Sequence, residues 1–256
     1  MARILVTGSA QGLGRAAAET LLGGVHQVVV HARDSVRART LTDLVDRGAE
    51  LVVADLADAT QTRQLADQVN RIGRMDSVIH NAGVYGDRDR HPNSDGHPRV
   101  LAVNTLAPYL LTSLIERPNR LIYLTSNMHV SGDDSLHDLE WASRRWNSTQ
   151  AYCDSKLFVT ALALAIARRW PGTISHAVDP GWVPTRMGGP SAPDDLELGH
   201  LTQTWLAVGN DPAATRSGQV WHHRRPAPVA AAAREHNFQD RLLARLAELT
   251  GHELAL

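Results

Sequence analysis

The sequence contains one lysine, one cysteine and no apolar run long enough to cross a bilayer. Cys153 is the only cysteine, so a disulfide within the chain is excluded and a reducing, cytoplasmic compartment is expected. The longest apolar run, residues 157–167, is interrupted only by Thr160 and predicts a buried or interface helix rather than a membrane span. A predicted strand begins at Ile4, so we expect no signal peptide.

An excess of charge of one sign is also missing. The chain has 26 Lys and Arg residues, 27 Asp and Glu residues and a net charge of −1, so it lacks the basic footprint of a protein that binds nucleic acid or an anionic membrane. The 13 histidines include His222-His223 but show no metal-ligand spacing, and we expect no metal site. A hydrophobic fraction of 43% is typical of globular proteins. We therefore expect a single domain over residues 1–256 whose partner is a small molecule.

The only lysine, Lys156, lies four residues after Tyr152. At this spacing the phenol and the ammonium share one face of a helix and can reach the same site. A free phenol has a pKa of about 10, and a cation within roughly 4–6 Å favours its ionised form. The pair is a candidate for proton transfer. The alternative is an ordinary helix that happens to carry both residues.

A glycine-rich turn follows the first predicted strand. Residues 4–7 are β-rich, Gly8, Gly12 and Gly14 come next, and helix-forming residues follow. Glycines allow the backbone to approach a pyrophosphate, and the free N–H groups and dipole of a helix N-terminus favour its negative charge. In this strand–turn–helix context the pattern predicts dinucleotide binding.

Short apolar strands alternate with helices of about 12 residues along the chain. This alternation predicts an α/β fold with a single Rossmann-type doubly wound sheet of about seven parallel strands and helices on both faces. The expected strands are 4–7, 28–31, 51–54, 77–80, 120–124, 174–178 and 219–222. The expected later helices are 34–47, 59–72, 100–115, 151–170, 196–208 and 240–249.

Ligands of such sheets collect at the carboxyl ends of the strands. Gly8, Arg33, Asp55 and the run Asn81-Ala82-Gly83 are all expected there, so they should line one crevice. Asn104 lies among apolar residues, where a buried amide is costly unless it is hydrogen-bonded. From the residues alone, it serves either the site or the attachment of its helix to a neighbouring backbone.

The end of the second strand bears on the choice of cofactor. A carboxylate there would bind a ribose 2′-hydroxyl, whereas an arginine accommodates a 2′-phosphate. The sequence has Ala32 followed by Arg33, which favours NADP(H) over NAD(H). Asp34 keeps NAD(H) possible if it reaches the ribose. Alternatively, Arg33 is a solvated charge and Asp34 caps the next helix.

Two segments without a clear period are expected to border the crevice. Residues 126–152 are predicted to form an excursion over the site, in which Trp141 and Trp146 either line an apolar substrate pocket or attach the excursion to the core. The Pro-, Gly- and Asp-rich stretch 179–195 is typical of a mobile flap or of a plain connecting loop.

The motifs, in their order along the chain, resemble the short-chain dehydrogenase/reductase family in its single-domain branch. The long gap between Ser126 and Tyr152, together with residues 31–34, is similar to the retinol-dehydrogenase-like subgroup, which includes bacterial reductases of polyketide ketones. We expect a substrate flap region over 186–210 and a C-terminal extension over 226–256, in which the stretch 226–251 also resembles the subgroup. The matching pieces are Thr7-Gly8-x3-Gly12-x-Gly14, Asp55-Leu56, Asn81-Ala82-Gly83, Asn104, Ser126, Tyr152-x3-Lys156, and Pro180-Gly181 with Thr185.

The resemblance implies a catalytic set of four residues. Tyr152 would exchange a proton with the substrate oxygen, and Ser126 would hydrogen-bond the same oxygen. Lys156 would lower the pKa of Tyr152 and hold the nicotinamide ribose, while Asn104 would anchor a water that links Lys156 to solvent. These roles imply hydride transfer between NADP(H) and an apolar ketone, aldehyde or secondary alcohol. The competing functions are a nucleotide-binding sensor on the same fold and a cofactor-bound epimerase or dehydratase.

The same resemblance implies the binding residues. Asp55 would receive the adenine amino group, the run 81–83 would pack along the adenosine, and the run 180–185 would hold the nicotinamide ring. The cofactor-binding set is Gly8, Gln11, Gly12, Leu13, Gly14, Arg33, Asp55, Leu56, Asn81, Ala82, Gly83, Tyr152, Lys156, Pro180, Gly181, Val183 and Thr185. The candidate substrate contacts are Asn127, Trp182 and Met187.

The chain departs from the family pattern at two positions. Asp179 precedes Pro180 where the family commonly has Asn or His, and Gln11 stands where many NADP-preferring members have a basic residue. Arg33 therefore carries most of the argument for NADP. The family also suggests a homodimer or homotetramer with helix 151–170 at one interface, although burial within one subunit would explain the apolar character of this helix equally well.

Overall fold

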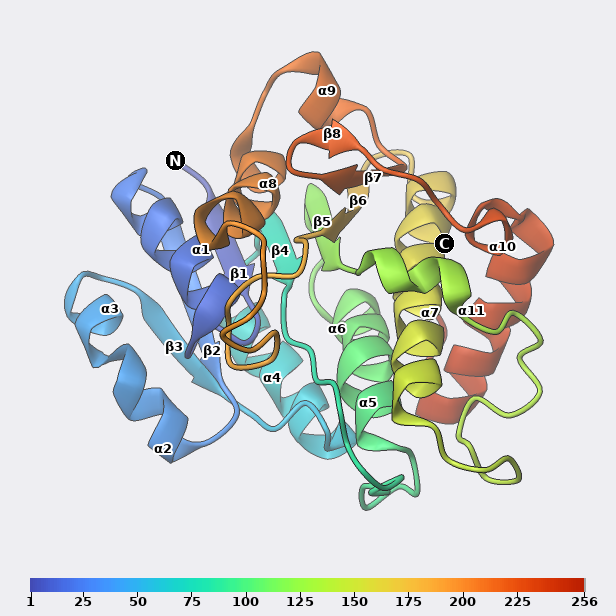
Figure 1. Cartoon of the computed structure of the whole chain (residues 1–256). Helices are drawn as coiled ribbons and strands as arrows, with labels where there is room; N and C mark the ends of the chain where they lie inside the picture. Colours follow the sequence, from blue (N-terminus) through green and yellow to red (C-terminus); the bar gives the residue numbers. More distant parts are fainter. Residues whose placement is uncertain (256) are drawn as a thin grey trace.

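A single eight-stranded sheet is the frame of the molecule (Figure 1). In this computed structural model, which describes residues 1–255, the strand order is β3-β2-β1-β4-β5-β6-β7-β8. The strands are β1 (Arg3–Val6), β2 (Gln27–Ala32), β3 (Glu50–Val53), β4 (Ser77–His80), β5 (Arg120–Leu124), β6 (Ile174–Asp179), β7 (Gln219–His222) and β8 (Arg225–Pro226). β1 to β7 pair in parallel, which confirms the expected fold class. β8 adds an antiparallel edge of two residues, too short for the sequence pattern to predict.

Helices cover both faces of the sheet (Figure 1). The helical segments are α1 (Gly12–Gly23), α2 (Ser35–Ala38), η1 (Arg39–Leu41), α3 (Thr42–Asp46), α4 (Ala59–Ile72), α5 (Arg99–Leu101), η2 (Ala102–Leu106), α6 (Ala107–Leu114), η3 (Asn127–Ser131), α7 (Ser148–Arg169), α8 (Leu196–Val208), α9 (Pro212–Thr215), α10 (Ala231–Arg234) and α11 (His236–Thr250). In β1, Leu5 belongs to the core with α4, α6, α7 and α11, whereas Ile4 and Val6 belong to the core with α1 and α8. A parallel sheet buried on both faces shows this division.

The helix expected over 34–47 is broken into α2, η1 and α3. Asp34 caps α2 by accepting a 2.7 Å hydrogen bond from the backbone N–H of Arg37. The hydroxyl of Thr40 then donates to the carbonyl oxygen of Arg37 at 2.8 Å. Because hydroxyls that bond to nearby carbonyls compete with helical hydrogen bonds, the continuous helix is interrupted here.

The helix expected over 100–115 is interrupted after α5 by a wider π-turn, η2, that contains Asn104. The side-chain oxygen of Asn104 accepts from Val84 N at 2.8 Å, and its amide donates to Val84 O and to Ser155 Oγ, each at 3.0 Å. These bonds tie the turn to the segment after β4 and to α7. Turns of this kind are frequent at functional sites.

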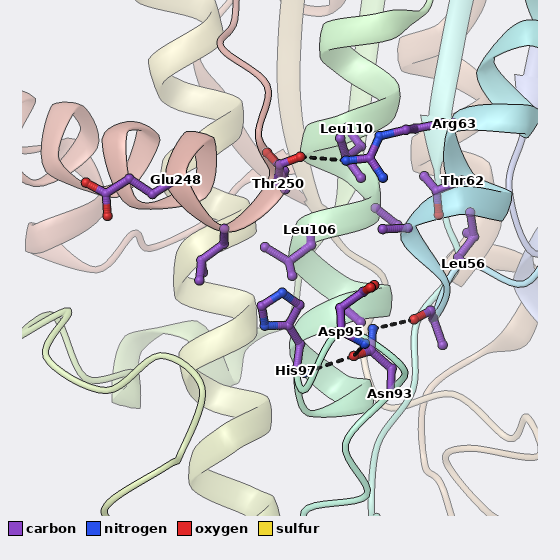
Figure 2. Close-up of a pocket in the computed structure, with 15 residues that line it drawn as sticks. Leu56, Thr62, Arg63, Asn93, Asp95, His97, Leu106, Leu110, Glu248 and Thr250 are labelled. Carbon is purple, nitrogen blue, oxygen red and sulfur yellow. Dashed lines mark hydrogen bonds between the residues drawn. The ribbon is translucent and has the colours of Figure 1, made fainter.

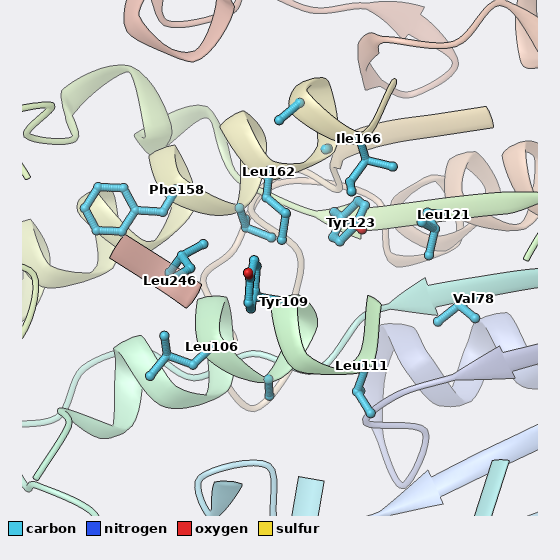
Figure 3. Packing of buried hydrophobic residues seen from close by; sticks show 14 of the residues in the cluster. Val78, Leu106, Tyr109, Leu111, Leu121, Tyr123, Phe158, Leu162, Ile166 and Leu246 are labelled. Atoms are coloured by element: carbon cyan, nitrogen blue, oxygen red, sulfur yellow. The ribbon is translucent and has the colours of Figure 1, made fainter. Parts of the chain in front are cut away.

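The apolar helix α7 is buried within the chain. Every residue from Ala151 to Ile166 is buried, because α5 and η2 pack on one part of the helix and α10 and α11 on another. Figure 3 shows Phe158 and Leu162 of α7 close to Leu246 of α11 in one apolar cluster. The C-terminal extension therefore covers the helix that was expected at a subunit interface, and an oligomer would have to use another surface. Among residues 1–255, no helix combines the length and hydropathy needed to cross a membrane.

The excursion between β5 and α7 is attached to the body of the domain. Trp141 is 6% exposed, its ring lies 5.4 Å from that of Trp146, and the Arg144 guanidinium stacks 3.6 Å from its centre. Arg144 also forms a 2.7 Å ion pair with Asp154 of α7, whose side chain is 2% exposed. Of the two alternatives for the tryptophans, the structure favours attachment to the core.

The region 186–210 divides into a loop and a core helix. α8 packs against α1 and the sheet, and its Leu206 is fully buried. At Gly199, an added Cβ would lie 2.8 Å from Val183 Cγ1, so α8 sits tightly against the stretch after β6. Only the part up to residue 195 remains as a loop over the crevice.

Candidate active site

The carboxyl ends of the strands open into a cavity of about 610 Å³. The sequence-predicted residues that line it are Gly8, Gln11, Gly12, Leu13, Gly14, Arg33, Asp55, Leu56, Asn81, Ala82, Gly83, Tyr152, Lys156, Pro180, Thr185 and Met187. The predicted residues outside its lining are Asn104, Ser126, Asn127, Gly181, Trp182 and Val183. The sheet thus brings the glycine turn and the Tyr–Lys pair to one crevice, as the strand order requires.

A second cavity, of about 440 Å³, lies between α4, α6 and the end of α11 (Figure 2). Among its polar groups, the Arg63 guanidinium donates to Thr250 O at 2.6 Å and the Asn93 amide donates to Ala57 O at 2.6 Å. These groups therefore serve the protein's own backbone. Leu56 is the one predicted site residue in its wall.

The glycine turn depends on the absence of side chains. Gly8 has a φ of +69°, and an added Cβ would lie 2.9 Å from Ala82 Cα. At Gly14 an added Cβ would overlap the Asn81 amide and the carbonyl oxygen of Gly8. Larger residues would therefore push the turn away from the segment after β4, and the backbone N–H groups would lose their position.

A buried histidine, which the sequence analysis missed, holds this turn. His31 Nδ1 accepts from Gly8 N at 2.9 Å, and its Nε2 lies 2.9 Å from Ala54 O. Burial lowers the pKa of His31 to about 4, so the ring is neutral at physiological pH. The ring links the ends of β1, β2 and β3. Its position within an apolar strand gives no signal of these contacts.

The crevice fits a dinucleotide. Asn81 donates its amide to Thr7 O at 2.9 Å, but its side-chain oxygen is buried without a partner among the described residues. Buried polar atoms require a partner, and this one belongs to a cavity-lining residue beside the exposed backbone of the turn. Arg37, a second missed residue, also lines the crevice and donates to Gln11 Oε1 at 3.2 Å.

Lys156 is held in the crevice by the end of β5. Its side chain is almost fully buried, and Nζ donates to Leu124 O at 2.8 Å. Thr125 Oγ1 donates to Lys156 O at 3.2 Å, which fixes the same turn of α7 from the other side. Burial lowers the pKa of Lys156 to about 8, and the carboxylate of Asp179 opposes this shift. An ammonium has three donors, so two remain for a ligand.

Tyr152 lies beside this ammonium, with Lys156 Nζ 5.5 Å from the centre of its ring. Burial raises the pKa of Tyr152 above its ordinary value, the Ser126 hydroxyl opposes the shift, and the charge of Asp179 adds to it. The net effect in these residues is opposite to the acidification expected from the lysine. Desolvation of the phenol is the largest cause of the shift, and the ammonium of Lys156 is itself directed to Leu124 O.

Ser126 lies two residues after the end of β5 and caps η3. Its Oγ accepts from Met128 N at 3.3 Å and lies 3.4 Å from Asn127 Oδ1. The Ser126 hydroxyl faces the phenol of Tyr152, since a hydrogen bond from Ser126 lowers the pKa of that phenol. The side-chain amide of Asn104, in contrast, is already hydrogen-bonded to Val84 and Ser155. Any contact of Asn104 with a water near Lys156 would therefore have to come from its backbone. Ser155 in turn donates to Tyr152 O at 2.8 Å.

The carboxylate of Asp179 is turned toward its own loop. It accepts from Gly181 N at 3.0 Å and lies 3.4 Å from His222 Nδ1 at the end of β7. The side chain is 10% exposed. The unusual residue before Pro180 is therefore a buried charge near the site rather than a solvated one.

Two large exposed apolar side chains, Tyr85 and Met187, line the crevice. Trp182 is 57% exposed and donates its indole N–H to Gly188 O, while Met187 is 46% exposed and lines the cavity. Tyr85, which the sequence analysis missed, also lines it, and its ring makes an edge contact with Tyr152 at 4.7 Å. Its place in a polar surface loop gave no signal. Within residues 1–255, no three His, Cys, Asp or Glu side chains are grouped so as to hold a metal ion.

Known proteins are similar to this chain in sequence and in fold. The short chain dehydrogenase family model matches residues 2–118. The short-chain dehydrogenase chry4 of Gibberella zeae is 39% identical over 259 residues, with 99% of each chain covered. Retinol dehydrogenase 13 of Homo sapiens is 29% identical over 98% of this chain and 85% of that protein.

Solved structures share the fold of this chain. RhlG of Pseudomonas aeruginosa, in an active-site complex with NADP, has a TM-score of 0.67 at 22% identity and covers 86% of this chain and 94% of its own. The resemblance drawn from the motifs, including the retinol-dehydrogenase-like and ketoreductase subgroup, is confirmed. The chain is a member of the short-chain dehydrogenase/reductase family and an NAD(P)-dependent oxidoreductase.

Proposed function

We propose that this protein transfers hydride between NADP(H) and an apolar ketone or aldehyde, or the corresponding alcohol. One observation carries the proposal: Tyr152 and Lys156 lie on one face of α7 and line the same crevice as the glycine turn. This geometry supports a proton donor and a dinucleotide-binding backbone at one site. The bound nicotinamide cofactor supplies or accepts the hydride.

The residues divide the remaining work. Tyr152 gives a proton to the carbonyl oxygen during reduction and takes it back during oxidation. Its raised pKa favours the protonated form, which suits the direction of reduction. The Ser126 hydroxyl donates to the same oxygen and stabilises the charge that develops on it. Lys156 uses its two remaining protons to hold ribose hydroxyls and keeps a positive charge near the phenol.

Two arginines support a preference for NADP(H). Arg33 and Arg37 both line the crevice beside the glycine turn. Asp34 is engaged as the cap of α2 and as the partner of Arg33 Nε at 2.9 Å, so it is not free to bind the ribose 2′-hydroxyl. Two guanidinium groups, beside an Asp34 carboxylate that is already engaged, suit a 2′-phosphate.

The walls of the mouth support an apolar substrate. Tyr85, Trp182 and Met187 are each more than two-fifths exposed, at 43%, 57% and 46%. Exposed large apolar side chains near a cleft mark a binding surface for an apolar ligand. Since Tyr85 and Met187 line the cavity and Trp182 lies outside its lining, we place the substrate between Tyr85, Met187 and the Tyr152 hydroxyl.

The test is the loss of NADPH absorbance with a panel of aryl and alkyl ketones and aldehydes. We expect turnover with at least one carbonyl compound and an alcohol product heavier by two hydrogens. Turnover without a change in substrate mass would indicate an epimerase, and loss of water would indicate a dehydratase. A protein that binds NADPH but converts no carbonyl, alcohol or imine would be the sensor.

A further inference from the structure

His129 joins the backbone of the catalytic serine to the C-terminal extension. Its Nδ1 lies 2.7 Å from Ser126 O, and its Nε2 accepts from Ala230 N at 3.2 Å. The ring is 1% exposed. Because a backbone N–H can only donate and a carbonyl oxygen can only accept, these contacts define a single tautomer, with the proton on Nδ1.

The ring is neutral in this arrangement. Burial lowers the pKa of His129, although the hydrogen bond to Ser126 O and the charge of Asp179 oppose the shift. A protonated ring would present a second N–H to the Ala230 N–H and break the contact. The neutral ring therefore links Ala230 N to Ser126 O by two hydrogen bonds.

Ala230 is itself held from both sides. Before it, Ala227 N donates to Val220 O of β7 at 2.8 Å. After it, α10 and α11 pack on α7, with Ala233 and Leu242 fully buried. The donor is thus part of the rigid cover of α7 rather than of a free loop.

The short helix η3, which contains His129, packs against α7. At Gly132 an added Cβ would lie 2.9 Å from Cys153 O, the carbonyl next to Tyr152. Ser126 O receives a second hydrogen bond, at 3.0 Å, from the backbone N–H of His129. The serine backbone is fixed by one residue twice, once by its main chain and once by its ring.

We propose that His129 is a positioning residue, through which the C-terminal extension holds the Ser126 hydroxyl in register with Tyr152. It touches neither substrate nor cofactor and acts only through Ser126. This inference rests on the proposed function of Ser126. A displacement of a catalytic group by about 1 Å can cost about a hundredfold in rate, so a lost anchor should appear in kcat.

Substitutions at His129 and Ala230 test each half of the connection. His129→Phe removes both hydrogen bonds at similar volume, whereas His129→Asn keeps a donor near the Nδ1 position. Ala230→Pro removes only the N–H, at a φ of −53° that proline tolerates, and Ala230→Ser keeps it. We expect kcat to fall about tenfold to a hundredfold in His129→Phe and by a smaller factor in Ala230→Pro. His129→Asn and Ala230→Ser should stay within about threefold of the wild type, with the Kd for NADPH unchanged throughout.

His176→Phe is the matched control. His176 is also 1% exposed, with Nε2 3.1 Å from Ala214 O and Nδ1 accepting from Trp221 Nε1 at 3.3 Å. It lies outside the catalytic set, so its loss should lower Tm while leaving kcat of the folded enzyme unchanged. If His129→Phe behaves in the same way, the ring is merely structural and the proposal is wrong.

The double variant with Ser126→Ala decides whether the effect passes through the serine. Two substitutions that act on one group are not additive, so His129→Phe should reduce kcat no further in the Ser126→Ala background. A full additional loss would overturn the proposal.

The tautomer gives a readout that does not depend on turnover. In the spectrum of the ¹⁵N-histidine-labelled protein, His129 should be protonated on Nδ1, and its Nε2 signal should change in Ala230→Pro. Protonation on Nε2 would overturn the inference whether or not the enzyme reduces ketones. A wild-type protein without any turnover would instead count against the proposed function.

Discussion

The ammonium nitrogen of Lys156 lies 5.5 Å from the centre of the Tyr152 ring and donates to the carbonyl oxygen of Leu124 at 2.8 Å. The cation therefore neighbours the phenol but is anchored to the sheet. Burial disfavours the charged form of both groups, so it lowers the pKa of the lysine and raises that of the tyrosine. The protein alone thus presents a protonated phenol, the form needed to donate a proton to a carbonyl.

Replacing Lys156 with Met should stabilise the fold. The pKa of Lys156 is about 8 in the folded protein against 10.5 when exposed, so the folded state disfavours the ammonium at pH 7. This cost is relieved only as the pH rises from about 8 towards 10.5. After allowance for the lost hydrogen bond, we expect the free energy of unfolding at pH 7 to rise by about 1–3 kcal/mol.

Urea denaturation of wild type and Lys156→Met at pH 7 measures this difference. Lys156→Arg is the control, because a guanidinium stays charged and is bulkier, and it should destabilise the protein. A Lys156→Met protein no more stable than the wild type would show that burial of the ammonium is not costly here.

Cofactor choice should depend on both arginines near the glycine turn. Arg33→Ala and Arg37→Ala should each weaken NADPH binding about tenfold, since each removes a charge-assisted hydrogen bond to the 2′-phosphate. The Kd for NADH should change less than about twofold, because NADH lacks that group. Fluorescence titration gives both constants. Equal weakening of the two cofactors would mean that the arginines act only on the local fold.

Stability should fall in mild acid because of His31. Its pKa of about 4 in the folded protein lies below the ordinary 6.5, so the unfolded chain binds more protons between these values. The contribution of His31 to the free energy of unfolding should therefore be complete above pH 6.5. It should decrease by about 3 kcal/mol as the pH falls towards 4. His80, whose pKa burial lowers to about 3, adds to the same trend.

Denaturation curves at several pH values measure this loss. His31→Gln should flatten the pH dependence, whereas His137→Gln, at an exposed position, should leave it unchanged. An equally steep pH dependence in His31→Gln would assign the proton uptake to other groups.

Substrate preference should respond to Tyr85. Its ring is 43% exposed and meets Tyr152 edge to face at 4.7 Å, so it can pack against an aromatic substrate. Aromatic pairs contribute about 0.5–1.5 kcal/mol beyond burial. In Tyr85→Leu, kcat/KM for aryl ketones should fall about three- to tenfold and that for alkyl ketones should stay within about twofold. An equal loss for both classes would place Tyr85 in the support of Tyr152 instead.

The regular parts of the fold were predictable because each has a local cause. The strands 77–80, 120–124 and 219–222 were located to the residue, since apolar runs bounded by turn residues define them. Gly8, Arg33 and Asn81 follow β1, β2 and β4, and the carboxyl ends of these parallel strands bring them to one crevice by topology alone.

The residues that were missed owe their roles to contacts between distant segments. His31 bonds to Gly8 and Ala54, and its place in an apolar strand gives no hint of either bond. Tyr85 owes its place at the site to its contact with Tyr152, which lies 67 residues later in the chain. The pKa of Tyr152 likewise depends on burial, and the four-residue spacing of Tyr152 and Lys156 in the sequence does not show how deeply the phenol is buried.

The central claim is that the Tyr152 hydroxyl passes a proton while hydride moves to or from the substrate. Steady-state NADPH oxidation with a reducible ketone, compared between wild type and Tyr152→Phe, tests it most directly. Loss of the hydroxyl should lower kcat by at least about a hundredfold, with the Kd for NADPH and the Tm near their wild-type values. A Tyr152→Phe enzyme with wild-type kcat would contradict the account.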